Sequence, residues 1–177
     1  SEDYSPMPAI GFKTAKTSGG YRSLVRITAI DTVLQTAINN SLIEECEKIF
    51  FNCNMAFRPD RGVYTALKRY VDFANKYSFV VKIDISNCYD DINHAVLSEA
   101  LPRFIRDGHI SSLIMKFVKT PVYVDKEITE TEKGLLQGMP LSPTLCNIYM
   151  HSLDEYLESF KIPSIRYADD IALFANT

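Results

Sequence analysis

Two adjacent aspartates inside an apolar hairpin pattern constrain the fold of this chain more than any other feature. The stretch SIRYADDIALFAN, residues 164–176, places Asp169 and Asp170 between two runs of apolar and β-branched residues. This pattern predicts two short strands joined by a turn that holds both acids. A buried, unpaired carboxylate is unstable unless it takes up a proton or binds a cation. The pattern therefore predicts a cation at this turn, with further oxygen ligands elsewhere in the chain.

A second apolar strand pattern ends at a third acid. The stretch FVVKIDI, residues 79–85, is rich in β-branched residues and predicts a buried central strand that ends near Asp84. If this strand and the aspartate hairpin pair in one sheet, the carboxylates of Asp84 and Asp169 project from the same edge. Carboxylate oxygens suit Mg²⁺, which completes its coordination with water and substrate phosphates. Two such ions support in-line phosphoryl transfer.

A simpler interpretation of each acid pair is that aspartates are common in turns for conformational reasons alone. Adjacent aspartates also follow a tyrosine at residues 89–91. There, Asp90 and Asp91 precede a predicted helix. Their negative charges would interact favourably with the positive, N-terminal end of the helix dipole. The other pair lies between two apolar strands and is therefore the better candidate for a metal site.

Apolar spacing elsewhere in the chain alternates between strand and helix patterns. Two further hairpins are predicted, over residues 11–28 with a turn from Thr17 to Gly20, and over residues 121–134. Helical spacing predicts four helices: from an N-cap at Asp31 to Ile49, over residues 62–77, from a cap at Asn93 to a stop at Gly108, and over residues 142–160. The mixture predicts an α+β fold in which helices pack behind a small antiparallel sheet.

The amino-acid composition limits the classes of protein to which this chain can belong. The chain has 177 residues, of which 46% are hydrophobic and 23% are charged, enough for one globular unit with a substantial core. Its four cysteines show no Cys-x-x-Cys spacing, which favours free thiols in a reducing compartment. No stretch is apolar enough to span a bilayer, and the first residues lack a signal-peptide pattern. We therefore expect a cytoplasmic protein that does not associate with membranes.

Charge is unevenly distributed along the chain. A formal net charge of −3 argues by itself against a nucleic-acid binder, since phosphate contacts come from Lys and Arg. Residues 11–28 nevertheless carry four basic side chains and no acid, and residues 56–70 carry four basic side chains and one acid. A basic first third and acidic clusters later could hold phosphates at one end and cations at the other. Two solvated faces would give the same pattern.

Five blocks in one order make the chain similar to a known family. They read YRSLVRITAIDTVLQTAI, MAFRPDRGVYTAL, VVKIDISNCYDDINHAVL, GLLQGMPLSPTLCNIYMHSLD and IRYADDIALFA. The chain resembles the reverse transcriptases of group II intron maturases and their bacterial relatives, which include retron, CRISPR-associated and abortive-infection types. The resemblance implies the fingers and palm of an RNA-directed DNA polymerase. It assigns residues 1–70 and about 95–130 to the fingers and residues 71–94 and 131–177 to the palm, with the last part of the palm and the thumb absent.

The resemblance also implies roles for individual residues. Asp84, Asp169 and Asp170 would be catalytic, with Asp170 in a supporting role. Asp84, Asp169 and the backbone carbonyl of Ile85 would hold two Mg²⁺ ions or Mn²⁺ in their place. The nucleotide would be bound by Arg22, Ile85, Tyr89, Gln137 and Gly138 and by a lysine, for which Lys13 and Lys16 are both candidates. The template would be bound by Arg58, Arg61, Ser142, Pro143 and Asn147. The expected partners are an RNA template, a DNA or RNA primer, deoxynucleoside triphosphates (dNTPs) and the thumb or appended domains of a parent protein.

The residue at position 89 helps to distinguish a DNA-synthesising enzyme from the alternative functions. In the family that the chain resembles, an aromatic residue at this place collides with a ribose 2′-hydroxyl, which implies a DNA product. Two other functions stay open. A palm polymerase that makes RNA, or that adds nucleotides without a template, would accept ribonucleotides, and a non-catalytic RNA-binding module would bind RNA without divalent ions. Without a thumb to hold the primer, the chain is expected to be weakly active or inactive alone.

Overall fold

Two small sheets organise the protein. A computed structural model describes residues 4–15 and 19–176. The first sheet has the strand order β2-β1-β4-β5 and the second has the order β3-β7-β6. The strands are β1 (Ala9–Ala15), β2 (Tyr21–Arg26), β3 (Phe79–Asp84), β4 (Val122–Val124), β5 (Glu127–Thr129), β6 (Ser164–Tyr167) and β7 (Asp170–Ala175). The predicted α+β class and the three predicted hairpins are confirmed, although Thr17 and Ser18 of the first turn lie outside the described residues.

Helices connect and cover the two sheets. They are α1 (Ala29–Glu47), α2 (Val63–Ala74), α3 (His94–Ala100), α4 (Gly108–Val118) and α5 (Ser142–Ser159), with a 3₁₀ turn at Leu101–Arg103. α1, α3, α4 and α5 meet in the main core, where Leu97, Ile114 and Leu145 are shielded from solvent. Burial of each such side chain stabilises the fold by about 1.5–3 kcal/mol. No helix in the described part of the chain is long and apolar enough to cross a bilayer.

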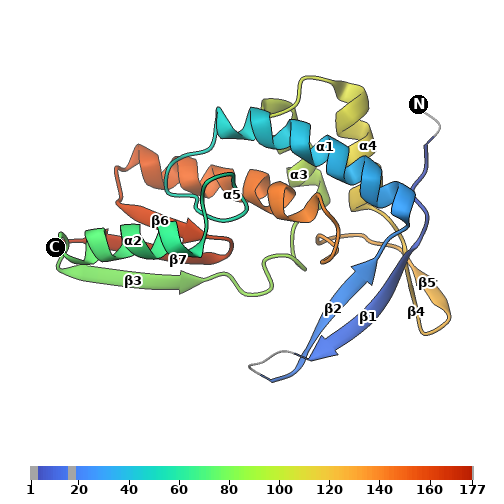
Figure 1. Ribbon diagram of the computed structural model, residues 1–177, viewed down its shortest axis with the longest axis horizontal. Coiled ribbons are helices and arrows are strands. Elements are labelled where there is room, and N and C mark those ends of the chain that lie inside the picture. The colour runs from blue at the N-terminus through green and yellow to red at the C-terminus, as the bar shows by residue number, and fades with distance from the viewer. Residues whose placement is uncertain (1–3, 16–18, 177) are drawn as a thin grey trace.

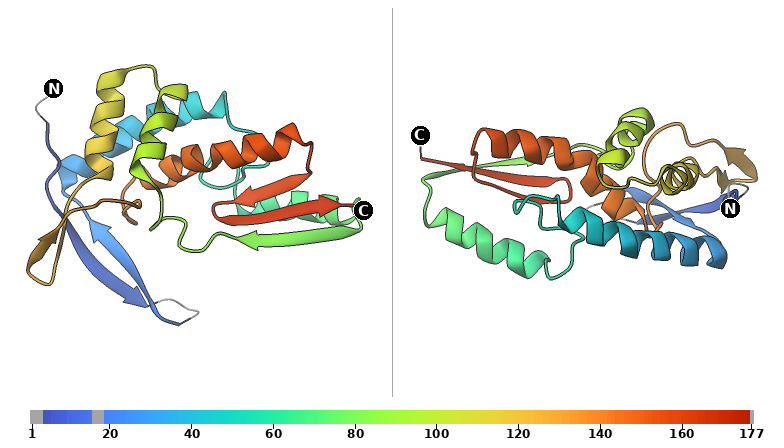
Figure 2. Two further views of the ribbon diagram at one scale, coloured as in Figure 1. Left: turned by 180° about the vertical axis from the view of Figure 1, so that it is seen from behind. Right: turned by 90° about the horizontal axis from the view of Figure 1, so that it is seen from above.

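The three-stranded sheet lies between α2 and α5 (Figures 1 and 2). Side chains alternate along β7: Ile171 joins the main core on the α5 side, whereas Ala172 and Phe174 pack with α2. The ring of Phe174 meets those of Tyr70 and Phe73 edge to face, with centroids 5.4 and 5.2 Å apart. Both faces of the hairpin between β6 and β7 are therefore supported by packing.

The register of β3 against β7 decides where the acids meet. The two strands are antiparallel, with Ile83 opposite Ile171 and Asp84 opposite Asp170. β3 thus ends beside the turn between β6 and β7, which contains Asp169. The predicted pairing of these strands in one sheet, with the acids at one edge, is confirmed.

β3 is an exposed edge strand, and the predicted buried central strand is wrong. All six of its residues are exposed, and Phe79 keeps 62% of its surface accessible. Among the described strands β3 pairs only with β7, and α2 contacts β6 at the other end of the strand order. A run of β-branched residues reports strand propensity, but it does not reveal whether a neighbouring layer covers the strand.

The predicted start of α1 is wrong by one helical turn. The N-cap is Thr28, whose hydroxyl accepts from the N–H of Asp31 at 3.1 Å. Asp31 lies buried in the first turn, where its carboxylate accepts from the hydroxyls of Thr28 and Tyr4, both at 2.6 Å. The hydrogen bond to Asp31 raises the pKa of Tyr4 to about 12. Asp31 therefore anchors the segment before β1 to α1 instead of capping the helix.

The helix predicted from Asn93 to Gly108 is shorter in the structure and ends at Ala100, and a further helix that was not predicted, α4, begins at Gly108. Asn93 caps α3 as expected and accepts from two N–H groups of its first turn. Pro102 has no N–H to continue the helix, and the chain passes through a 3₁₀ turn. Asp107 then caps α4, so Gly108 begins a helix instead of ending one. α2 is also shorter than predicted and ends at Ala74.

The predicted division between fingers and palm remains a prediction. α2 belongs in part to the range assigned to the fingers, because it begins at Val63. Its side chains Ala66, Tyr70 and Phe73 nevertheless pack with the inner residues of the three-stranded sheet. Residues 63–70 therefore lie with the sheet that carries the acids.

His151 of α5 is buried in a cage of aromatic rings. It stacks on Phe51 with ring centroids 5.2 Å apart and meets Phe104 edge-on at 5.3 Å. Burial lowers the pKa of the His151 imidazole below its ordinary value of 6.5, against the opposing charge of Asp154. In the unfolded chain the imidazole keeps its ordinary pKa and binds a proton as the pH falls through about 6.5. The unfolded state then gains stability that the folded state does not.

We expect the free energy of unfolding to fall on acidification more steeply in the native protein than in His151→Phe. The variant keeps an aromatic ring in the cage but cannot titrate. The difference between the two slopes should reach at most about 1.4 kcal/mol per pH unit, the value for one proton. Urea titrations from about pH 7 to about pH 5 measure both slopes. Parallel profiles would show that His151 does not contribute.

Candidate active site

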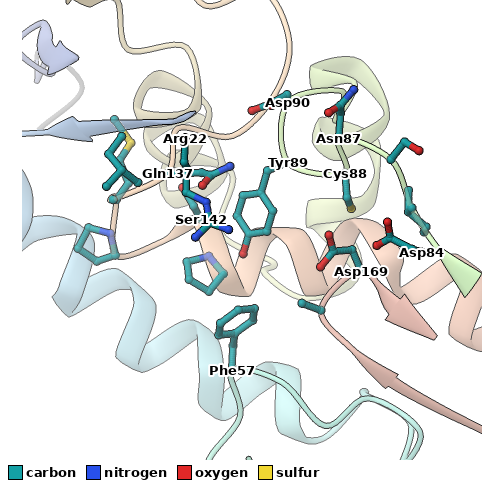
Figure 3. A pocket seen from close by; sticks show the side chains of 18 residues that line it. Arg22, Phe57, Asp84, Asn87, Cys88, Tyr89, Asp90, Gln137, Ser142 and Asp169 are labelled. Atoms are coloured by element: carbon teal, nitrogen blue, oxygen red, sulfur yellow. The ribbon is translucent and has the colours of Figure 1, made fainter. Parts of the chain in front are cut away.

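A pocket of about 850 Å³ is lined by residues of both sheets and of the loops between them. Its walls come from β2, the loop after β3, the loop before α5, the turn between β6 and β7, and Phe57 (Figure 3). The lining residues for which a catalytic or binding role was predicted are Arg22, Asp84, Ile85, Tyr89, Gln137, Gly138, Ser142, Pro143 and Asp169. Residues that are remote in sequence therefore meet at one pocket.

The carboxylates of Asp84 and Asp169 lie on one wall of this pocket. Figure 3 shows them next to each other, one at the end of β3 and one in the turn between β6 and β7. The turn is tight because Ala168 adopts a left-handed conformation with φ 57°. Ile85 follows Asp84 along the same wall. The structure thus brings together the three residues that were predicted to hold metal.

The oxygen atoms at this wall fit a hard divalent cation. Within residues 4–15 and 19–176, no three His, Cys, Asp or Glu side chains form a cluster that could hold a metal. Two carboxylates with a neighbouring backbone carbonyl are what Mg²⁺ takes from a protein when water and phosphate supply its other ligands. A structural zinc site would need four protein ligands. The donor set therefore fits Mg²⁺ better than a closed structural ion.

Asp170 faces a different cavity from its neighbour Asp169. It is exposed and lies opposite Asp84 in the strand register, but it lines a separate cavity of about 280 Å³ between α2 and the sheet. Lys82 and Tyr70 line the same cavity. The supporting catalytic role predicted for Asp170 remains a prediction, and its position separates it from the pocket of the other two acids.

The loop before α5 lies directly against β2. The N–H of Val25 donates to the carbonyl of Gln137 at 2.8 Å. Gly138 has φ 112°, and a Cβ there would collide with the carbonyl of Val25, so only glycine suits the position. This close approach brings Gln137 to the same pocket as Arg22, which is the basic residue among the described lining residues.

Lys13, one of the two lysines predicted to bind the nucleotide, does not line this pocket. Lys13 lines a separate cavity of about 250 Å³ beside β4, and Lys16 lies outside the described residues. In the β1–β2 hairpin Lys13 pairs with Ser23, whereas Arg22 pairs with Thr14. Because neighbouring positions on a strand point to opposite faces, Lys13 and Arg22 cannot approach one ligand from the same face.

Tyr89 projects into the pocket from the loop after β3 (Figure 3). Its carbonyl accepts from the N–H of Leu135 at 2.7 Å, and the carbonyl of Ile92 accepts from Gly134 at 2.7 Å. Gly134 has φ 82°, and a Cβ there would press on the carbonyl of Asp90. Burial raises the pKa of Tyr89 well above its ordinary value of 10.0. The side chain is therefore a neutral phenol, and the loop that carries it is held by backbone hydrogen bonds to residues 134–135.

Arg58 is a structural residue, and its predicted template contact is wrong. It is only 7% exposed, and its Nε and Nη2 donate to the carboxylate of Glu47 at 2.6 and 2.9 Å. Its Nη1 donates to the carbonyls of Phe51 and Asn54. The guanidinium therefore links the segment of residues 51–58 to the end of α1. The excess of basic residues around Arg58 did not reveal its ion pair with Glu47, which lies eleven residues earlier in the sequence.

The other residues predicted to bind the template differ in their placement. Asn147 of α5 is 1% exposed and hydrogen-bonds within the protein through both atoms of its amide, which contradicts a template contact. Arg61 is partly exposed and donates to Asn52 at 2.8 Å. Ser142 and Pro143 line the pocket. Template binding by Arg61, Ser142 and Pro143 remains a prediction.

Phe57 and Cys88 line the pocket although no role in a site was predicted for either. Phe57 has φ 57° and is 44% exposed, with its ring centroid 6.5 Å from that of Tyr167. Cys88 lines the pocket beside Tyr89, and its Sγ lies 4.0 Å from that of Cys146. All four cysteines are free, as predicted, and buried. Both missed residues stand inside the quoted sequence blocks, which is the signal that could have found them.

The sequence matches a known family over most of its length. Residues 14–177 match the family described as reverse transcriptase (RNA-dependent DNA polymerase). The group II intron-encoded protein LtrA of Lactococcus lactis subsp. cremoris is 34% identical over 160 residues, which cover 90% of this chain and 27% of that protein. The retron Ec83 reverse transcriptase of Escherichia coli is 29% identical over 181 residues, which cover 93% of this chain and 52% of that protein. The chain thus spans a minor part of the first relative and half of the second.

Solved structures share the fold. Telomerase from Candida albicans, in complex with a TWJ fragment of telomeric RNA, matches with a TM-score of 0.74 and 12% identity over 99% of this chain and 39% of that chain. A partial Cas6-RT-Cas1–Cas2 complex matches with a TM-score of 0.55 and 21% identity over 98% of this chain and 30% of that chain. At these identities the likeness concerns the fold alone. The sequence match carries the assignment: this chain belongs to the reverse transcriptase family.

Proposed function

We propose that this chain contains the nucleotide-binding and catalytic part of an RNA-directed DNA polymerase, which adds deoxynucleotides to a primer. The observation that carries the proposal is the meeting of Asp84 and Asp169 in one pocket with Arg22 across from them (Figure 3). Because the chain covers only 27% of LtrA, the substrates and partners are part of the proposal. They are an RNA template, a DNA or RNA primer, dNTPs and the remainder of a longer protein.

The residues on each wall of the pocket would have a distinct role in the proposed reaction. The guanidinium of Arg22 would donate to triphosphate oxygens, which its planar fork matches two at a time. The backbone at Gln137 and Gly138 would lie against the nucleotide, since glycine has no side chain to keep it away. Mg²⁺ held by Asp84 and Asp169 would supply Lewis-acid stabilisation of the developing charge. The primer 3′-hydroxyl would attack the α-phosphate, and pyrophosphate would leave.

Tyr89 would select the sugar of the incoming nucleotide. Its ring projects into the pocket, and its backbone carbonyl accepts from the N–H of Leu135. In Tyr89→Ala the obstacle to a 2′-hydroxyl is gone, so we expect the preference for dNTPs over ribonucleotides to fall at least about tenfold, or about 1.4 kcal/mol. Tyr89→Phe keeps the ring and should keep the preference. The ratio of kcat/KM for the two nucleotides measures the effect, and an unchanged ratio in Tyr89→Ala would exclude Tyr89 as the selecting residue.

Primer extension under single-turnover conditions tests the proposed function. The protein is used in excess over the primer, so that weak primer binding does not hide activity. We expect extension with dNTPs on an RNA template, dependent on Mg²⁺ and lost in Asp84→Asn. Extension that prefers ribonucleotides or needs no template would contradict the proposal and indicate another palm polymerase. RNA binding that is unaffected by EDTA, with neither extension nor binding of Mn²⁺, would overturn it in favour of a binding module.

A further inference from the structure

A buried polar network lies directly beneath the turn that carries Asp169. Arg166 of β6 is completely buried, and its Nε and Nη2 donate to the carboxylate of Asp154 at 2.7 and 2.5 Å. Its Nη1 donates to the side-chain oxygen of Asn147 and to the carbonyl of Ala168, both at 3.0 Å. Asp154 and Asn147 both belong to α5. The guanidinium therefore links α5 to the peptide that joins Ala168 to Asp169.

The network also reaches a second wall of the pocket. The amide nitrogen of Asn147 donates to the carbonyl of Ala56 at 2.8 Å. The next residue, Phe57, has a left-handed backbone conformation and lines the pocket. The backbone of Arg166 strengthens this link, because its N–H donates to Cys53 and its carbonyl accepts from Met55, each at 2.8 Å. One cluster thus holds the backbone next to Asp169 and the backbone next to Phe57.

Stability alone is a weak reason for such a network. Two charges buried in a core lose their hydration, and apolar side chains of similar volume often stabilise a core as well or better. Ala168 and Phe57 are both non-glycine residues with φ near 57°, a left-handed conformation that L side chains rarely adopt. The hydrogen bonds to the carbonyls of Ala168 and Ala56 act on these two strained turns. What the network adds is therefore a fixed geometry at two walls of the pocket.

We propose that Arg166, Asp154 and Asn147 are positioning residues that hold the carboxylate of Asp169 in the orientation needed to share a divalent cation with Asp84. The proposal rests on the proposed function of the pocket. None of the three residues lines the pocket, so they act through the backbone of the Ala168 and Phe57 turns and not by contact with substrate. A ligand whose orientation depends on such supporting hydrogen bonds typically loses about 10- to 100-fold in metal affinity or activity when they are removed.

Asn147→Leu tests the proposal with little change of volume. The variant removes the acceptor for Arg166 and the donor to Ala56. We expect Mn²⁺ affinity, measured by the loss of the free-ion EPR signal, to fall about 10- to 100-fold. The kcat of primer extension should fall by a similar factor while the KM for dNTP stays within about twofold. Circular dichroism and thermal unfolding establish that the variant is folded.

Glu155→Gln is the matched control. Glu155 is the residue after Asp154 on α5 and accepts two hydrogen bonds from Arg103 at 2.9 and 3.1 Å, but this pair is exposed. We expect no change in Mn²⁺ affinity or kcat. If Asn147→Leu does not fold, Arg166→Lys takes its place, because lysine keeps the charge beside Asp154 but cannot reach all three partners at once. The same losses are expected for it.

The outcomes separate this proposal from the proposed function. A folded Asn147→Leu or Arg166→Lys with the Mn²⁺ affinity and kcat of the parent would overturn the positioning role. Asp84→Asn and Asp169→Asn serve as the reference for the site itself. If neither of these changes Mn²⁺ binding, the metal site and the proposed function fail, whatever the network does.

Discussion

Asp169→Asn is expected to lower the single-turnover rate of primer extension by at least about 10³-fold. The carboxylate of Asp169 shares a pocket wall with that of Asp84, and an amide is a poor ligand for a hard cation. Loss of about 4 kcal/mol of charge stabilisation in the transition state corresponds to this factor. Asp170→Asn should retain activity within about tenfold, since its side chain lines the cavity beside α2.

The comparison of Asp169→Asn with Asp170→Asn isolates the effect of position, because the two residues are adjacent and chemically identical. Both substitutions remove one charge from the same hairpin, so a general effect on stability or nucleic-acid affinity would appear in both. Circular dichroism checks that each variant is folded. Equal losses in Asp169→Asn and Asp170→Asn would show that the pocket assignment does not distinguish the two acids.

Arg166→Met is expected to destabilise the protein by about 3–5 kcal/mol, because it leaves Asp154 as an uncompensated buried charge. Both partners of this ion pair are completely buried. Arg103→Met breaks a similar two-bonded pair with Glu155 at the surface, where solvent screens the charges. Its cost should stay below about 1 kcal/mol. Urea unfolding at neutral pH measures both values.

A double variant separates the value of the pair from the penalty of the unpaired charge. Arg166→Met combined with Asp154→Leu removes both charges and fills the space with apolar atoms. We expect it to recover most of the loss seen in Arg166→Met. A single variant that costs no more than Arg103→Met would contradict the burial and pairing of Arg166.

The sequence predicted the elements that depend on local pattern. The Asp169 hairpin, the strand before Asp84 and the helix over residues 142–160 follow from apolar spacing and turn residues. Because antiparallel pairing fixes which residues stand opposite each other, the meeting of the acids at one sheet edge could also be inferred. The exposure of β3 could not, since it depends on which segments cover the sheet.

Side-chain roles were less predictable than elements. Arg58 and Asn147 stand in blocks that suggested template binding, yet each is engaged by groups elsewhere in the protein. Asp169 and Asp170 are indistinguishable by residue type, and only the fold directs them to different cavities. Long-range hydrogen bonds and the direction of successive side chains at a turn decide such roles.

We propose that Asp84 and Asp169 share one divalent cation. Crystals of this chain soaked in MnCl₂ and a dNTP test it through the anomalous signal of manganese. We predict a peak at bonding distance, about 2.1 Å, from a carboxylate oxygen of each residue. A peak coordinated by Asp170 without Asp84 and Asp169, or fully occupied dNTP with no metal between these two carboxylates, would show that Asp84 and Asp169 do not share a cation.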